Sequence, residues 1–124
     1  MIAADSSSLI AYLSGAAGRD VQQIDDALAG NSLCIPPVVI TEILSDPKQT
    51  PGLHASLVAC PLLEITFGYW ERAGHLRAQL LTLRLGAKIP DTLIAQSCID
   101  HDVALITRDG DFRHFAKHCG LKLA

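Results

Sequence analysis

The sequence lacks the features that mark membrane, secreted and zinc–thiolate proteins. No apolar run approaches the roughly 20 residues that a helix needs to cross a bilayer. The first residues carry no basic segment, and Asp5 interrupts what would have to be the apolar part of a signal peptide. The four cysteines stand singly, without C-x-x-C or other zinc-like spacing. We therefore expect a cytoplasmic protein with reduced, mostly buried thiols and no membrane partner.

Missing motifs narrow the enzyme classes further. The serine run at residues 6–8 is not set in G-x-S-x-G, which argues against a serine hydrolase. His114 and His118 are four residues apart and share a helix face, but the Glu of H-E-x-x-H is absent and no third ligand is identifiable. A zinc site there is the less favoured alternative to a solvated helix end. The sequence shows no repeat, low-complexity segment or domain linker.

The composition is that of one globular domain. The chain has 124 residues, of which 49% are hydrophobic and 19% charged, so we expect a single domain over residues 1–124. The net charge of −3 does not favour binding to nucleic acid, but the basic residues are unevenly placed. Eight of the ten lie after residue 70, at Arg72, Arg77, Arg84, Lys88, Arg108, Arg113, Lys117 and Lys122. If five of the thirteen acids bound metal, the remaining surface would be slightly positive. Solvated helix faces explain any single basic residue equally well.

Short apolar segments alternate with helical ones, which is typical of an α/β domain with a mainly parallel sheet. We predict strands at residues 1–4, 32–35, 62–66, 103–107 and 121–123. We predict helices at residues 7–13, 20–29, 36–44, 69–85, 90–101 and 112–118. Residues 46–52, D-P-K-Q-T-P-G, form the one clear loop.

Acidic residues interrupt this apolar pattern at four places. Asp5 and Asp109 follow predicted strands, whereas Glu42 lies within an apolar helix and Asp91 at a helix start. Ligands of open α/β sheets bind beyond the carboxyl ends of the strands, so these positions suit a functional site. Each acid also has a structural alternative: Asp5 and Asp91 could cap helices, Asp109 could form a turn before Gly110, and Glu42 could face solvent.

Carboxylates gathered at one rim would repel one another. Two unit charges 4 Å apart cost roughly 4 kcal/mol at an effective dielectric of 20. A divalent cation resolves that conflict, and oxygen-only ligation suits Mg²⁺ or Mn²⁺. The pattern therefore favours a site for phosphate chemistry.

The segments that carry these acids resemble the motifs of the PIN domain, and within it the VapC-type toxin ribonucleases, along essentially the whole chain. Residues 5–10, D-S-S-S-L-I, resemble the opening D-[ST]-[SN]-x-L-I, and residues 41–43, T-E-I, the second acidic motif. Residues 89–95, I-P-D-T-L-I-A, are similar to P-x-D-x-x-I-A, the most specific match. Residues 105–112, L-I-T-R-D-G-D-F, resemble L-[IV]-T-x-D-x-D-F.

The resemblance implies a site and an activity. The acidic quartet would be Asp5, Glu42, Asp91 and Asp109, and Asp111 could be a fifth metal-binding carboxylate. Ser7 and Thr107 would be supporting hydroxyls that orient carboxylates or water. The implied protein is an endoribonuclease that uses Mg²⁺ or Mn²⁺ and a metal-activated water to hydrolyse RNA. Its implied partners are a VapB-like antitoxin and a second copy in a homodimer. Ser6 departs mildly from the commoner Thr.

Other interpretations stay open at this stage. A catalytically inactive PIN-like module would bind RNA or a protein, although intact acids argue against it. A receiver domain or another Mg²⁺-dependent phosphotransfer enzyme would want an early acid pair and a strand-terminal Asp in mid-chain, and both are missing. The pair Tyr69-Trp70 could stack on bases, but core packing or a dimer contact is favoured. The loop at residues 46–54 could contribute to substrate binding, to antitoxin binding or to neither.

Overall fold

The sheet at the centre of the fold is short and fully parallel. The computed structural model describes residues 1–48 and 52–124, so part of the predicted loop 46–52 lies outside the described residues. Within the described part, strands β1 (Ile2–Ala4), β2 (Leu33–Cys34) and β3 (Ala104–Ile106) form a sheet of order β2-β1-β3. Both neighbours run parallel to β1. The predicted α/β class with a parallel sheet is confirmed.

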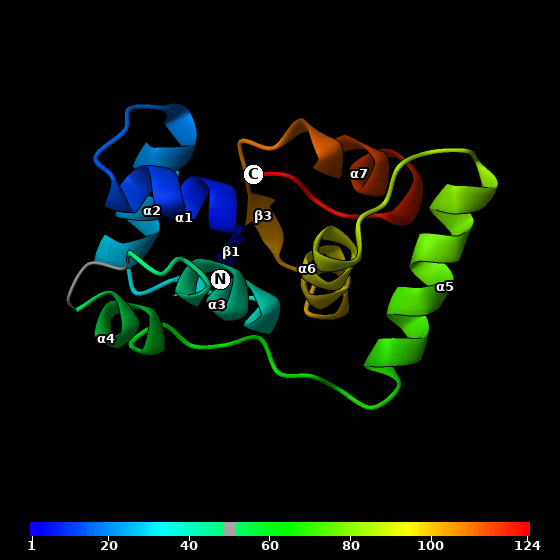
Figure 1. The fold of residues 1–124 in the computed structure, drawn as a ribbon, viewed down its shortest axis with the longest axis horizontal. Helices are drawn as coiled ribbons and strands as arrows, with labels where there is room; N and C mark the ends of the chain where they lie inside the picture. Colours follow the sequence, from blue (N-terminus) through cyan, green and yellow to red (C-terminus); the bar gives the residue numbers. More distant parts are fainter. Residues whose placement is uncertain (49–51) are drawn as a thin grey trace.

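Helices surround this sheet. Helices α1 and α2 lie together at one end of the molecule and α5 lies at the other, with α6 and the strands between them (Figure 1). The helices of the described residues are α1 (Ser6–Leu13), α2 (Arg19–Ala29), α3 (Pro37–Leu44), α4 (Leu53–Val58), α5 (Tyr69–Thr82), α6 (Ile89–Asp100) and α7 (Arg113–Cys119), with a 3-10 turn η1 (Gly110–Phe112). Among them, none is both long and apolar enough to cross a membrane.

The core is continuous from the strands to the helices. The small residues Ala3 and Ala4 in the central strand are completely buried, so helices can pack close against the sheet. Phe112 and Phe115, at the carboxyl end of the chain, are each 1% exposed and lie against each other with ring centroids 6.0 Å apart. The packing of Phe112 anchors the segment that follows β3, which carries two of the predicted acids.

Two predicted strands are wrong. Residues 62–66 and 121–123 form single parallel bridges, between Ile35 and Leu62 and between Leu105 and Leu123, instead of strands. In the first segment only Leu63 is buried, whereas Leu62 is 53% exposed and Ile65 is 38% exposed. An isolated apolar run therefore predicted a longer strand than the sheet can pair.

Most predicted helix ends lie within one residue of the observed ones, but one helix is shorter than predicted and another was not predicted. Helix α5 ends at Thr82 instead of residue 85, because Arg84 takes a positive φ of 59° and the amide of Leu85 donates back to the carbonyl of Leu80. Helix α4 was not predicted, since only one of its side chains, Leu57, is buried and its apolar periodicity is weak.

The topology brings separate segments to one edge of the sheet. Because β1 and β3 are parallel neighbours, Asp5 and Thr107 follow them at the same edge. The amide of Asp5 continues the ladder by donating to the carbonyl of Ile106 at 3.1 Å. Residues separated by about a hundred positions in the sequence are therefore held side by side by backbone pairing.

Candidate metal centre

Asp5 is the buried anchor of the site. Asp5 is 2% exposed. Its carboxylate accepts hydrogen bonds from the Ser8 amide at 3.0 Å, the Ser7 hydroxyl at 2.9 Å and the Thr107 hydroxyl at 2.6 Å. Asp5 is also the N-cap of α1, so the capping alternative and the position at the sheet edge both hold. Burial raises the pKa of Asp5 and the charge of Asp109 adds to this, whereas the three hydrogen bonds oppose it.

Asp109 is tied to Asp5 through Thr107. The Asp109 amide donates to the Thr107 hydroxyl oxygen at 3.0 Å, and that hydroxyl donates in turn to Asp5. The Asp109 carboxylate caps the η1 turn by accepting from the Asp111 amide at 2.9 Å. The turn predicted at Asp109 is therefore present. It brings the carboxylate of Asp111 close to that of Asp109.

Asp91 completes a group of three aspartates. It lies in the first turn of α6 but makes no capping hydrogen bond, since Lys88 holds the N-cap position. One carboxylate oxygen from each of Asp91, Asp109 and Asp111 lies within 4.8 Å of the others. Burial, together with the charges of Asp109, Glu42 and Asp111, raises the pKa of Asp91 to about 6. Capping therefore does not explain Asp91, and the ionised carboxylate of Asp91 is repelled by the neighbouring acids.

Glu42 borders this group without belonging to it. Its carboxylate accepts a hydrogen bond from the Ser6 hydroxyl at 3.1 Å and is half-buried, so Glu42 is not a freely solvated side chain. Its charge contributes to the raised pKa of Asp91, which places it near the cluster. Neither Glu42 nor Asp5 is among the three acids whose oxygens gather within 4.8 Å.

Two contacts to the acids were missed from the sequence. Ser6 was noted only as a departure from Thr, yet it donates to Glu42. The Lys88 ammonium lies 3.8 Å from a carboxylate oxygen of Asp111 and lowers the pKa of Asp91. The serine run beside Asp5 was a usable signal for Ser6. Lys88 gave none, because an exposed Lys at a helix start is ordinary.

The residues fit a divalent cation with oxygen ligands. The three gathered groups are all carboxylates, and within the described residues no hydrogen bond occupies the carboxylate of Asp91. Such a donor set suits Mg²⁺ or Mn²⁺. Within residues 1–48 and 52–124, no histidine belongs to such a group, so the zinc alternative at His114 and His118 gains no support.

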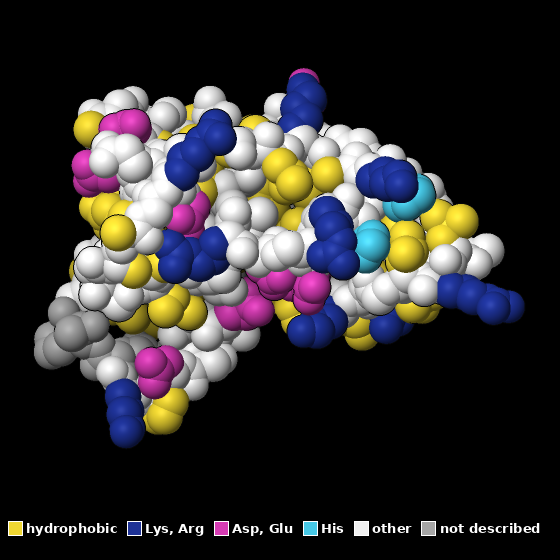
Figure 2. All heavy atoms as spheres, turned by 90° about the horizontal axis from the view of Figure 1, so that it is seen from above, with side chains coloured by type: hydrophobic (Ala, Val, Ile, Leu, Met, Phe, Trp, Pro, Cys, Tyr) yellow, Lys and Arg dark blue, Asp and Glu magenta, His cyan; other side chains and the backbone are white. Residues whose placement is uncertain are grey.

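The surroundings of the cluster are basic and partly hollow. Figure 2 shows Asp and Glu side chains near the middle of one face, with Lys and Arg side chains on either side. A cavity of about 240 Å³ borders the cluster and is lined by Lys88, Asp91, Asp111 and His114, among others. The arrangement can therefore hold a cation and an anionic group next to each other.

The raised pKa of Asp91 predicts that metal binding depends on pH. A cation must displace the proton that Asp91 holds below a pH of about 6. Between pH 7.5 and pH 5, Mn²⁺ affinity is expected to fall roughly 10-fold for one competing proton of this pKa. Calorimetric titration of Mn²⁺ at both pH values measures this, with circular dichroism showing that the protein stays folded. An affinity equal at both pH values would contradict the assignment of Asp91 as a ligand.

The sheet and its acidic edge define an α/β domain with a candidate divalent-metal centre where parallel strands end. The chain belongs to the PIN domain family, whose sequence model matches residues 2–118. No curated protein sequence matches it.

Solved structures share the fold. One is a toxin–antitoxin complex from Klebsiella pneumoniae, with a TM-score of 0.71 and 24% identity over 98% of this chain and 95% of that one. Another is VapBC2 from Rickettsia felis bound to a DNA fragment from its promoter, with a TM-score of 0.70 and 21% identity over 100% of this chain and 98% of that one. At these identities the likeness concerns the fold.

Proposed function

We propose that this protein is a Mg²⁺- or Mn²⁺-dependent endoribonuclease and the VapC-type toxin of a toxin–antitoxin pair. The observation that carries the proposal is the cluster of Asp91, Asp109 and Asp111 at the carboxyl edge of a PIN-domain sheet. A non-catalytic domain gains nothing from carboxylates close enough to raise the pKa of Asp91 to about 6. The similarity in fold to chains of toxin–antitoxin complexes supports the same conclusion.

The chain's own residues would divide the work of hydrolysis. Asp91, Asp109 and Asp111 would hold the cation, with Glu42 and Asp5 adding negative charge at its border. A bound divalent cation polarises a phosphoryl oxygen and lowers the pKa of a water. Asp5 is fixed in advance by the hydroxyls of Ser7 and Thr107, so its orientation does not depend on substrate.

The basic groups beside the cluster would bind the RNA backbone. Lys88 and His114 line the cavity that borders Asp91 and Asp111, and a phosphodiester placed there would be close to both cation and ligands. The Lys88 side chain is 76% exposed, so its ammonium can turn from Asp111 to a phosphate at little cost. Electrostatic contacts of this kind carry no base information.

Metal-dependent cleavage is the direct test. The purified protein, free of any bound inhibitor, is incubated with single-stranded and structured RNAs in Mg²⁺, Mn²⁺ or EDTA. Cleavage is expected with either metal, is expected to be absent in EDTA, and should drop at least 100-fold in Asp109→Asn because a metal ligand loses its charge. Asp26→Asn, which removes an exposed carboxylate from α2, is the matched control and should retain full activity.

The same experiment addresses the alternative. Binding of RNA without cleavage, by folded protein that also binds Mn²⁺, would favour an inactive PIN-like binding module. Cleavage that persists in EDTA would exclude the metal mechanism.

We place the activity in the cytoplasm, since all four cysteines are free thiols, as expected in a reducing compartment.

We propose that the antitoxin covers the groove beside Glu42. This hollow of about 210 Å³ lies among α1, α3 and α4 and carries the exposed apolar residues Ile10 (53%) and Leu13 (45%) next to Glu42. Exposed apolar surface of this kind marks protein interaction sites. A partner bound there would lie against a site carboxylate, which gives neutralisation a physical basis.

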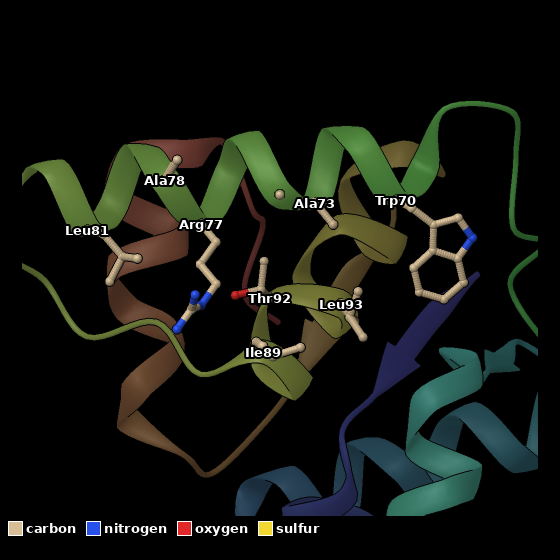
Figure 3. A pocket seen from close by; sticks show the side chains of 9 residues that line it. Trp70, Ala73, Arg77, Ala78, Leu81, Ile89, Thr92 and Leu93 are labelled. Atoms are coloured by element: carbon tan, nitrogen blue, oxygen red, sulfur yellow. The ribbon is translucent and has the colours of Figure 1, made fainter.

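A second copy is proposed at the groove between α5 and α6. Figure 3 shows Trp70 at one end, Leu81 at the other and Ile89 and Leu93 along the floor of this cavity of about 330 Å³. Trp70 is 62% exposed and Ile89 is 57% exposed. Tyr69, by contrast, is buried and donates to the Leu93 carbonyl at 2.7 Å, so the two aromatic neighbours have different roles.

A further inference from the structure

A second polar network joins Asp20 of α2 to Arg108 in the segment after β3. Arg108 pairs with Asp20 through two hydrogen bonds, from Nε at 2.7 Å and from Nη2 at 3.0 Å. The Ser8 hydroxyl donates to the same Asp20 carboxylate at 2.8 Å, and Arg108 also donates to the carbonyl of Ala17 at 3.3 Å. The proposed hydrolysis uses none of these residues.

The network connects to the site at both ends. Ser8 donates its amide to Asp5 and its hydroxyl to Asp20, so one residue contacts both aspartates. Arg108 stands in sequence between Thr107, which donates to Asp5, and Asp109, whose amide donates to Thr107. The contacts therefore form a closed ring from Asp5 through α1 and α2 to the segment after β3 and back to Asp5.

The ring is well shielded at its centre. Ser8 is fully buried, and the Asp20 side chain is 13% exposed. The Arg108 hydrogen bonds hold the pKa of Asp20 well below its usual range, and Ser8 contributes to this. Gly18 leaves room for the pair, because a Cβ there would lie 2.6 Å from an Asp20 carboxylate oxygen and 3.0 Å from Nη2 of Arg108, and its φ of 151° disfavours other residues.

We propose that Arg108 and Asp20 are positioning residues of the metal centre: their ion pair fixes the segment after β3 so that Thr107 and Asp109 keep their contacts around Asp5. Thr107 and Asp109 lie on an irregular segment between β3 and η1, where no ladder or helix fixes the backbone. The bidentate contact of Arg108 with Asp20 of α2 adds a restraint to those that Phe112 packing and the Thr107 hydroxyl supply. The inference rests on the proposed function for its effect on cleavage, but not for its effect on backbone order.

The protein offers a matched control for this pair. Arg72 and Asp100 form the same two-bond arrangement, at 3.1 Å and 2.7 Å, between the first turn of α5 and the end of α6. Side-chain exposures are nearly equal, at 41% and 11% against 39% and 13% for Arg108 and Asp20. Neither control residue contacts the carboxylates of the site, so any merely structural effect of losing an ion pair appears in Arg72→Ala as well.

The experiment compares wild type with Arg108→Ala, Arg108→Lys, Asp20→Asn, Gly18→Ala and Arg72→Ala. Mn²⁺ affinity is measured by titration, kcat and KM are measured on a cleaved RNA, and ¹⁵N relaxation of the metal-free protein gives backbone order parameters. Arg108→Ala and Asp20→Asn are expected to lower Mn²⁺ affinity and kcat about 10-fold to 100-fold, as residues supporting metal ligands do. KM should change less than kcat, because substrate-binding groups are untouched. Arg108→Lys should recover only part of this loss, since one ammonium cannot reproduce the fork.

Order parameters decide the inference even if no RNA is cleaved or no Mn²⁺ binds. The order parameter of the Asp109 amide should fall from a rigid value of about 0.85 toward 0.6 in Arg108→Ala, Asp20→Asn and Gly18→Ala. In Arg72→Ala it should keep the rigid value. Absence of cleavage by wild type would defeat the proposed function while leaving this result standing. An unchanged Asp109 amide, or equal effects in Arg108→Ala and Arg72→Ala, would overturn the positioning role.

Discussion

Asp91→Asn is expected to abolish metal-dependent cleavage and, at the same time, to stabilise the metal-free protein at pH 7. Activity is lost because a neutral amide replaces one of the three gathered carboxylates. Stability rises because ionised Asp91 is partly desolvated and faces the charges of Asp109, Glu42 and Asp111. Asn has nearly the same size, so the substitution removes repulsion without opening a cavity.

The size and pH range of the gain follow from the pKa. A rise from 3.8 to about 6 means that the folded protein binds the Asp91 proton more tightly than the unfolded chain does. Wild type therefore loses stability as pH rises from 4 to 6, and the penalty is complete above that range. Solvent screens a half-buried group, so we expect about 1–2 kcal/mol in the free energy of unfolding.

Urea unfolding in EDTA at pH 7 and pH 4 measures this gain, which should be present at pH 7 and absent at pH 4. Asp100→Asn is the control in the same helix, with the opposite sign. Burial opposes ionisation of Asp100, but the hydrogen bonds from Arg72 and Gln96 prevail and lower its pKa. Asp100→Asn should therefore destabilise the protein at pH 7 and leave cleavage intact. A loss of stability in Asp91→Asn would mean that its carboxylate makes a structural contact instead.

The sequence predicted the acidic edge because each acid stands beside a strand end or helix start that can be recognised from neighbouring residues. Asp5 follows a buried strand directly, and the parallel pairing of β1 with β3 makes Thr107 its neighbour. Residue type and strand end together predicted that Asp5 and Asp109 share one edge, whereas the role of Thr107 came from the resemblance to the PIN domain. The same local logic predicted helices well, since their apolar periodicity and their Gly and Pro boundaries lie within a few residues.

Contacts between residues far apart in the chain could not be predicted from the sequence. The pairing of Arg108 with Asp20 joins residues 88 positions apart, and each alone is an ordinary charged surface residue in the sequence. Leu62 and Leu63 form an apolar pair typical of a strand, but the sheet is too short to pair more than one bridge with Ile35. Which acids approach closely also depends on packing: Asp111 belongs to the group within 4.8 Å, whereas Asp5 does not.

Substitutions at Asp5 and Asp91 are therefore expected to differ in their effect on stability, although the resemblance to VapC-type ribonucleases gave the two residues the same role. Asp5→Ala should abolish cleavage and lower the free energy of unfolding by about 2–4 kcal/mol, because it removes a helix cap and leaves buried donors without an acceptor. Those donors are the Ser8 amide and the hydroxyls of Ser7 and Thr107. Asp5→Asn keeps one acceptor oxygen and should be inactive but close to wild type in stability, within about 1 kcal/mol.

A double-mutant cycle separates lost contacts from lost charge. In Asp5→Ala the Thr107 hydroxyl has already lost this acceptor, so the double variant Asp5→Ala/Thr107→Val should lose less stability than the sum of the two single losses. Urea unfolding of the four proteins at pH 7 in EDTA gives the coupling, and we expect about 1–2 kcal/mol. Additive losses would show that the 2.6 Å contact contributes nothing to folding. In that case the hydroxyl of Thr107 would act on the reacting water or the substrate, and any stability lost in Thr107→Val would come from the Asp109 amide, which donates to the same hydroxyl oxygen.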